Sequence, residues 1–139
     1  MPKQTSFTGL LIALFVIGCW ATSIILLMRW TVNFSNPFTY LFILLQMHLY
    51  TGLFITAHDA MHCTVSANRQ INNFIGYTCT FLYALFWYPQ LYTKHHRHHR
   101  HVHSNSDPDY HEGSFFLWYF NFIKNWVEHT YRCSTFIFI

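Results

Sequence analysis

The sequence predicts an all-α integral membrane protein: an antiparallel transmembrane helix hairpin, followed by interfacial or re-entrant helices with histidine boxes on the cytoplasmic side. Only 9% of its 139 residues are charged, against about 25% in soluble domains, and 53% are hydrophobic. Two long uncharged runs lie before position 58, and seven of the eleven histidines lie within 95–111. We therefore expect one membrane domain that carries a histidine cluster at the membrane edge.

The first uncharged run, 7–28, is closed by Arg29. As a helix rising about 1.5 Å per residue, it is long enough for the roughly 30 Å hydrocarbon core of a bilayer. The apolar part of a secretory signal is usually about 7 to 15 residues long and ends at a small-residue cleavage site. This run is longer and lacks such a site, so we expect a transmembrane helix.

The second uncharged run, 38–57, follows a short polar turn, and Pro37 is suited to the first turn of its helix. Its length again predicts a transmembrane helix. His48 lies inside this run, where a polar group normally faces protein or a cavity. We expect a hydrogen-bonded interior histidine there rather than a metal ligand, because burying an unpaired polar group is costly.

The string HDAMH directly follows the second run, with no Gly or Pro between them. If the helix continues, His58 and His62 lie one turn apart on the same face and can share a metal. The zinc-protease motif needs Glu directly after the first histidine, and Asp59 occupies that position, so that motif is excluded.

The third apolar segment, 74–92, decides the topology. Gly76 and Pro89 interrupt it, and aromatic residues cluster near its end, as at membrane interfaces. We expect it to be re-entrant or interfacial, so that the histidines on either side of it share one membrane face. Arg29 lies on the other face, and the positive-inside rule makes the histidine face cytoplasmic. The bases expected on that face are Lys3, Arg69, Lys94, Arg97 and Arg100.

The histidine cluster, 95–111, has the density of a ligand set. On a helix, His95, His98 and His99 are at i, i+3 and i+4, which places three imidazoles on one side. A histidine-rich tract that binds divalent ions loosely is the alternative. Asp107 and Asp109 can orient a ligand histidine by a hydrogen bond, ligate metal, or serve only in capping and solubility. The histidines whose roles stay open are His96, His101, His103 and His129.

Nucleic-acid binding is disfavoured, because the bases lie beside hydrophobic runs and among histidines and form no basic face. The four cysteines are scattered, without a CxxC pair, so we expect free thiols.

The motifs HDAMH, HHRHH and DPDYH, in this order, resemble the membrane-bound fatty acid desaturase and hydroxylase superfamily, and within it the beta-carotene ketolases. The strings INNFIG, LYALFWYPQL and SFFLWYF are also similar to that family. The resemblance extends from about Phe7 to about Lys124.

This resemblance implies a non-haem di-iron centre, O₂ as co-substrate, and oxygen insertion at the allylic C4 position of a carotenoid ring. Two hydroxylations there, followed by loss of water, leave a ketone. It also implies a carotenoid substrate dissolved in the bilayer and a ferredoxin-like electron donor. By position, the residues implied to ligate iron are His58, His62, His95, His98, His99 and His111.

The sequence departs from the family pattern near its end. The family carries another HxxHH box after further hydrophobic segments, and this sequence reaches Ile139 without one. Cys63 stands where the family usually has Gly. We therefore expect a truncated, frameshifted or fragmentary chain that is not catalytic alone, with 114–126 as an interfacial helix.

Two alternatives remain open. An acyl-lipid desaturase or a carotenoid hydroxylase of the same superfamily would share the metal chemistry and differ in substrate. A non-enzymatic, histidine-rich membrane protein would bind divalent ions without consuming O₂, but it predicts acidic residues within the spans, and the runs 7–28 and 38–57 contain none.

Overall fold

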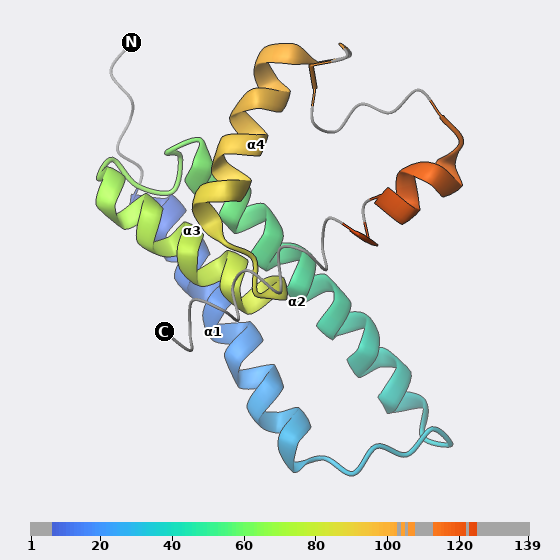
Figure 1. Ribbon diagram of the computed structural model, residues 1–139. Helices are drawn as coiled ribbons and strands as arrows, with labels where there is room; N and C mark the ends of the chain where they lie inside the picture. The colour runs from blue at the N-terminus through green and yellow to red at the C-terminus, as the bar shows by residue number, and fades with distance from the viewer. Residues whose placement is uncertain (1–6, 103, 105, 108–112, 122, 125–139) are drawn as a thin grey trace, which may run out of the picture. The chain divides into compact units, whose positions relative to one another are not determined.

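The computed structural model describes residues 7–102, 104, 106–107, 113–121 and 123–124, and every regular element in this part of the chain is an α-helix (Figure 1). The prediction of an all-helical protein is confirmed. The chain divides into two compact units, residues 1–83 and 84–139. The four labelled helices are α1 (Phe7–Arg29), α2 (Pro37–Met61), α3 (Arg69–Ala84) and α4 (Tyr88–His101). A shorter helical segment covers 115–121.

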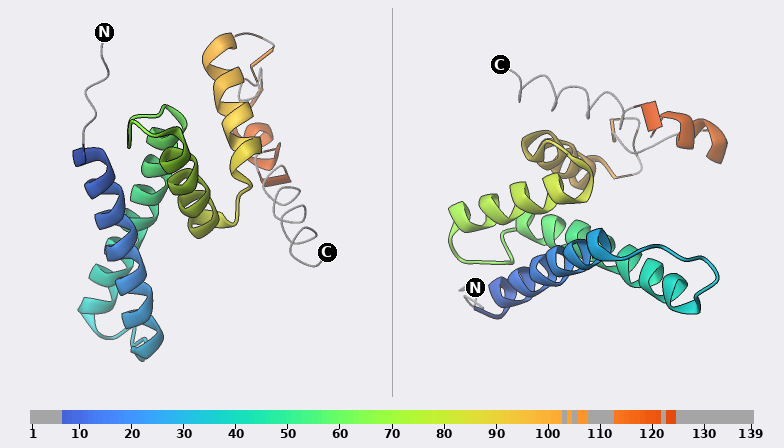
Figure 2. Two further views of the ribbon diagram at one scale, coloured as in Figure 1. Left: turned by 90° about the vertical axis from the view of Figure 1, so that its left-hand side faces the viewer. Right: turned by 90° about the horizontal axis from the view of Figure 1, so that it is seen from below.

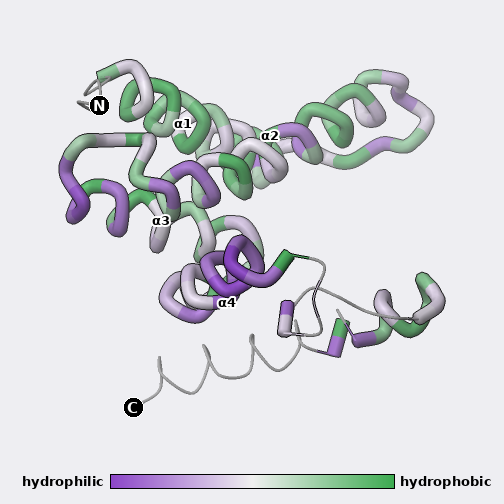
Figure 3. The backbone as a smooth tube through the Cα atoms, turned by 90° about the horizontal axis from the view of Figure 1, so that it is seen from above, coloured by the Kyte–Doolittle hydropathy of each residue, from purple (hydrophilic) through white to green (hydrophobic). Residues whose placement is uncertain are grey.

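Helices α1 and α2 are long and apolar enough to cross a membrane. They lie side by side in both views of Figure 2, and hydrophobic residues dominate α1 in Figure 3. Both predicted helices are therefore present. Helix α2 also continues past Ala57 to Met61, which places His58 on its last turn.

Local sequence explains where α2 begins and ends. Asn36 is the N-cap, and its side-chain oxygen accepts a hydrogen bond from the Phe38 amide at 3.1 Å. Pro37 occupies the first turn, where no amide partner is needed. At the other end, Cys63 adopts φ 56° and donates its amide to the Ala60 carbonyl at 3.1 Å. This left-handed residue stops the helix just after the HDAMH string.

The core of the first unit lies where α1, α2, α3 and the loop 62–68 meet. Small residues such as Ala13 and Ala57 allow close approach of the helices, as is common in membrane proteins. Farther along the pair, the Ser23 hydroxyl of α1 donates to the Gln46 side-chain oxygen of α2 at 2.7 Å. The buried apolar residues of this core are Ala13, Leu53, Ala57, Ala60, Val65, Ile75 and Cys79.

The segment 74–92 contains parts of two helices. Helix α3 ends at Ala84, Leu85 adopts φ 56°, and α4 begins at Tyr88 with Pro89 in its first turn. The left-handed backbone at Leu85 and the missing amide of Pro89 account for this break.

The expectation of an interior His48 is wrong for this structure, in which His48 is exposed on α2. The buried side of α2 carries Leu53, Ala57 and Ala60. At about 100° per residue, His48 lies on the opposite side of the helix from Ala57 and about 120° from Ala60.

Candidate metal centre

Helix α2 presents the first pair of histidines. His58 lies on the last turn of the helix, and His62 is its C-cap residue. Their ring centroids are 4.7 Å apart, as expected for residues one turn apart on one face. Both side chains are partly buried. His58 Nδ1 lies 3.5 Å from a carboxylate oxygen of Asp59, at the limit of hydrogen-bond distance.

Helix α4 presents the second group of histidines. The Nε2 atoms of His95 and His99 are 3.1 Å apart, so the two ring nitrogens face one point. The i, i+4 spacing on an uninterrupted helix produces this arrangement.

Asp107 contacts His98, the second histidine of the HxxHH box formed by His95, His98 and His99. His98 Nδ1 lies 2.9 Å and 3.0 Å from the two carboxylate oxygens of Asp107. The Asp107 side chain is only 4% exposed and that of His98 is 34% exposed. A carboxylate on Nδ1 places the proton on that nitrogen and leaves Nε2 able to bind a metal.

His96 has a local contact on its own helix. Its Nδ1 lies 2.9 Å from the Tyr92 carbonyl oxygen, and the two rings stack with centroids 4.1 Å apart. His101 is exposed at the end of α4. The predicted site residues Asp109 and His111 lie outside the described residues, as do His103 and His129.

The spacing of the α4 histidines fits a transition metal. An imidazole nitrogen binds such an ion at about 2.1 Å, so two ligands at a right angle have their nitrogens about 3.0 Å apart. The distance of 3.1 Å between the Nε2 atoms of His95 and His99 matches this value. A donor set of neutral imidazoles suits iron, copper or zinc and leaves the ion strongly positive.

The loop after HDAMH is held by Asn72, whose role the sequence did not reveal. Its side chain is fully buried at 0% exposure. Its amide nitrogen donates to the carbonyl oxygens of Ser66 at 2.6 Å and Asn68 at 2.9 Å, and its oxygen accepts from the Ser66 amide at 3.1 Å. Asn72 thus ties the start of α3 to the loop that begins at His62. Asn72 lies in the string INNFIG, but nothing in that string alone indicates its hydrogen bonds to the loop.

Helix α1 supports the same loop. A Cβ atom at Gly9 would lie 2.8 Å from the Val65 carbonyl oxygen and 3.0 Å from that of Thr64. Thr64 in turn donates its hydroxyl to the Asp59 carbonyl at 2.9 Å. The backbone of α1 therefore packs directly against the loop that follows the first histidine pair.

The buried cysteine of α3 is not suited to be a ligand. Burial raises the pKa of the Cys79 thiol to about 12, so it stays protonated near neutral pH. Metal binding requires the thiolate. Cys19, Cys63 and Cys79 are free thiols in the structure, as the sequence predicts.

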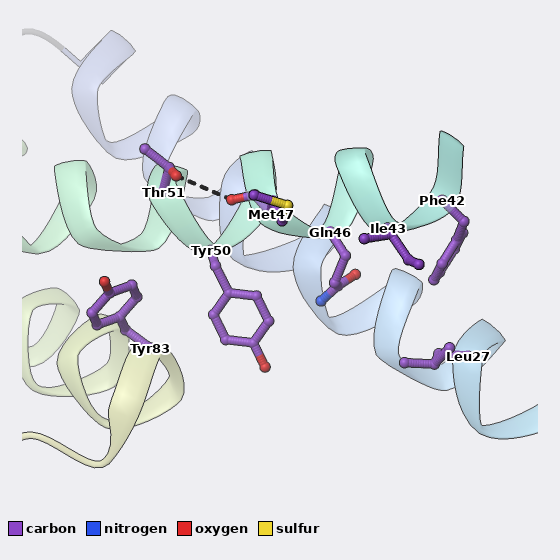
Figure 4. Close-up of a pocket in the computed structure, with 8 residues that line it drawn as sticks. All are labelled: Leu27, Phe42, Ile43, Gln46, Met47, Tyr50, Thr51 and Tyr83. Carbon is purple, nitrogen blue, oxygen red and sulfur yellow. Dashed lines mark hydrogen bonds between the residues drawn. The ribbon is translucent and has the colours of Figure 1, made fainter. Parts of the chain in front are cut away.

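An open groove runs along α2 on the side of α1 and α3 (Figure 4). Its volume is about 500 Å³, and its lining is mainly apolar. The residues that line it are Leu27, Phe42, Ile43, Gln46, Met47, Tyr50, Thr51 and Tyr83.

Comparison with known proteins relates this chain to carotenoid ketolases. Residues 35–139 match the family model described as fatty acid desaturase. Beta-carotene 4-ketolase 3 of Haematococcus lacustris is 46% identical over 91 residues, which cover 63% of this chain and 28% of that protein. Zeaxanthin 4-ketolase of Chlamydomonas reinhardtii is 35% identical over 141 aligned positions, covering 91% of this chain and 32% of that protein.

A bacterial carotenoid ketolase is also similar to this chain. Beta-carotene ketolase of Paracoccus sp. strain PC1 is 44% identical over 79 residues, which cover 56% of this chain and 33% of that protein. The chain thus spans about a third of the length of these curated relatives. No solved structure shows significant similarity to it.

Proposed function

We propose that this chain, which belongs to the fatty acid desaturase family, forms part of a membrane di-iron oxygenase. The proposed reaction introduces a keto group at the allylic C4 position of a carotenoid ring. The family match extends over residues 35–139 and includes both histidine boxes. The ketolase resemblance that the motifs indicate is confirmed by relatives that are 35% to 46% identical.

The main support for the proposal is the geometry of His95 and His99, whose Nε2 atoms face each other 3.1 Å apart. Both residues belong to the HxxHH box at 95–99, which lies within the family match. The pair His58 and His62 offers two more imidazoles on one helix end. The proposed iron ligands are His58, His62, His95, His98, His99 and His111. Asp107 supports His98, and Asp109 is proposed to support the ligands in the same way.

Iron would supply activation of O₂ when bound. Each hydroxylation of the C4 methylene takes one O₂, two electrons and two protons, and it releases one water. A second hydroxylation at the same carbon gives a geminal diol, which loses water to leave the ketone. The electrons are proposed to come from a ferredoxin-like donor.

Asp107 would prepare His98 of this chain to bind the iron. The carboxylate of Asp107 keeps the proton of His98 on Nδ1 and so fixes which ring nitrogen is free.

We also propose the membrane arrangement. Helices α1 and α2 form an antiparallel transmembrane hairpin, and the loop at 30–36 lies on the side opposite the histidines. The segment 74–92 is re-entrant or interfacial. Both histidine boxes then face the cytoplasm, on the side richer in Lys and Arg.

The family description itself favours one alternative, an acyl-lipid desaturase, and a carotenoid hydroxylase is a further member of this class. These enzymes would leave a double bond or a single hydroxyl on their products. The names of the similar proteins favour the ketolase.

The test uses the protein expressed from its natural gene in bacterial cells that make β-carotene. We expect extracted pigments to include 4-keto carotenoids, identified by chromatography and mass. His99→Ala should abolish the ketone and lower the iron content of the purified protein. His101→Ala, an exposed position on the same helix, is the matched control and should change neither. A hydroxylated or desaturated product without a ketone would favour the alternatives, and an active His99→Ala protein would refute the proposed iron ligation.

A further inference from the structure

Helix α4 carries a stripe of bases in addition to its histidines. Lys94, Arg97 and Arg100 recur every third residue, and we call these three residues the basic stripe. At about 100° per residue, Lys94 and Arg100 each lie about 60° from Arg97 around the helix axis. Arg97 itself lies about 160° from both His95 and His99. The centre of the basic stripe is therefore opposite the facing pair of proposed iron ligands.

The charges of the basic stripe are not neutralised by the described residues. Arg97 and Arg100 are exposed, Lys94 is half-buried, and none of the three forms an ion pair with a described carboxylate. Asp107 is the only carboxylate described within 84–139, and both of its oxygens contact His98. The helix dipole favours bases in the last turn, which accounts for Arg100 but not for Lys94 or Arg97. Three uncompensated positive charges are thus available to an acidic partner.

The second half of α4 is poorly suited to insertion into lipid. A helix that binds a membrane surface buries an apolar face among the lipid headgroups. Every residue within 94–101 is Lys, Arg or His, and hydrophilic residues dominate α4 in Figure 3. The aromatic residues Tyr88 and Tyr92 lie in the first two turns of the helix, before the basic stripe begins. The basic stripe therefore suits the surface of another protein better than a layer of lipid.

The position of the basic stripe suits the delivery of electrons. Each hydroxylation in the proposed function consumes two electrons, and a donor must bring them close to the iron because electron transfer slows steeply with distance. An α-helix with its side chains is about 10 to 12 Å across, so a partner seated on Arg97 would be about this far from the imidazoles of His95 and His99. The backbone of α4 joins the two sides covalently.

We propose that the basic stripe docks an acidic electron-transfer protein, which supplies the electrons of the oxygenase reaction. This inference rests on the proposed function, and it adds the docking surface and the charge of the donor. The reduced partner gives up two electrons for each O₂ consumed and leaves oxidised, and water supplies the two protons. Complementary charge mainly accelerates association and makes it sensitive to salt.

A binding experiment tests the docking surface without iron. The protein expressed from its natural gene is purified iron-free in discs of uncharged phosphatidylcholine, and its affinity for a plant-type [2Fe–2S] ferredoxin, an acidic redox protein, is measured by biolayer interferometry. Raising the ionic strength from about 0.02 M to about 0.5 M should weaken binding about tenfold. Arg97→Glu should weaken binding about tenfold at the lower ionic strength. Arg69→Glu makes the same charge change at an exposed position of α3 and should bind as the unaltered protein does.

A kinetic experiment measures the ketolase reaction with reduced ferredoxin as the varied substrate. The KM for ferredoxin should rise about tenfold in Arg97→Glu and stay unchanged in Arg69→Glu. The KM for β-carotene should be the same in both variants. Thermal unfolding checks that the variants are folded, and the salt dependence of the unaltered protein tests the proposal without any substitution.

The outcomes separate this inference from the proposed function and from a lipid site. Absent or salt-independent ferredoxin binding by the unaltered protein, or an equal loss in Arg69→Glu, overturns the docking surface. Unaltered ferredoxin binding in Arg97→Glu also overturns it, and weaker retention of phosphatidylglycerol by that variant in native mass spectrometry would then assign the stripe to lipid. If the unaltered protein forms no ketone but its ferredoxin binding depends on Arg97, the proposed function fails and the docking surface stands.

Discussion

Asp107 supports the histidine motif of α4 by a contact with His98 that only the structure shows. The sequence presents two aspartates, Asp107 and Asp109, on either side of a proline, with the same possible roles. The structure shows that Asp107 is buried and contacts His98 Nδ1 with both carboxylate oxygens, at 2.9 Å and 3.0 Å. Such a contact fixes the ring orientation and increases the basicity of the other nitrogen.

Asp107→Ala should therefore weaken metal binding. Loss of a carboxylate that orients a ligand histidine typically lowers metal affinity about 10- to 100-fold. The measurement is a titration of the iron-free protein with Fe²⁺ in competition with a coloured chelator. Ser106→Ala, an exposed neighbour, is the control and should bind as the unaltered protein does. Equal affinities in the two variants would mean that His98 does not need Asp107.

Asn72 has a different role at the residue scale, because it holds the loop rather than a ligand. Asn72→Leu keeps a similar volume but leaves the buried partners at Ser66 and Asn68 without their hydrogen bonds. We expect a loss of about 2 to 4 kcal/mol in the free energy of unfolding, measured by denaturation in detergent.

Asn73→Leu is the matched control for this prediction. Asn73 is the next residue of α3 and is only partly buried. A loss of stability at this position as large as that in Asn72→Leu would contradict a specific role for the Asn72 contacts.

At the scale of elements, the contact of α1 with the loop 62–68 connects the first span to the histidine site. Gly9 permits this contact because it has no Cβ atom. The nearest atoms belong to the backbone of Thr64 and Val65, which cannot move aside as a flexible side chain can.

Gly9→Ala should destabilise the protein by about 1 to 3 kcal/mol, as overpacking usually does. Gly18→Ala, on the same helix, meets no atom within 4 Å and should be neutral or slightly stabilising, because Ala favours a helix over Gly. Thermal unfolding in detergent compares the two. If the variants have equal melting temperatures, the close approach at Gly9 does not contribute to stability.

At the scale of the whole molecule, the proposed site requires both histidine boxes on one side of the bilayer. Single cysteines at Ala67 and Val102, in a protein without other cysteines, should react with an impermeant thiol reagent from the same side of sealed vesicles. A cysteine at Ser35, in the loop between α1 and α2, should react only from the other side. Labelling of Ala67→Cys and Val102→Cys from opposite sides would rule out a shared centre and with it the proposed function.

The sequence by itself determined the helices and the local geometry of the histidines. Length and apolar composition predict helices over 7–28 and 38–57, and the i, i+4 spacing predicts that His95 faces His99. These features depend on interactions between neighbours along the chain, and the helical repeat alone determines them. The break at Leu85 was less apparent, because its left-handed backbone has no glycine to mark it.

Only the tertiary structure decided which residues support those histidines. Asp107 reaches His98 from beyond the end of α4, and Gly9 meets the loop at Val65 from the first helix. The exposure of His48 likewise depends on which side of α2 packs against its neighbours. Such contacts join segments that are separate in the sequence, and they depend on how helices pack in three dimensions, which the pattern of residues along one helix does not specify.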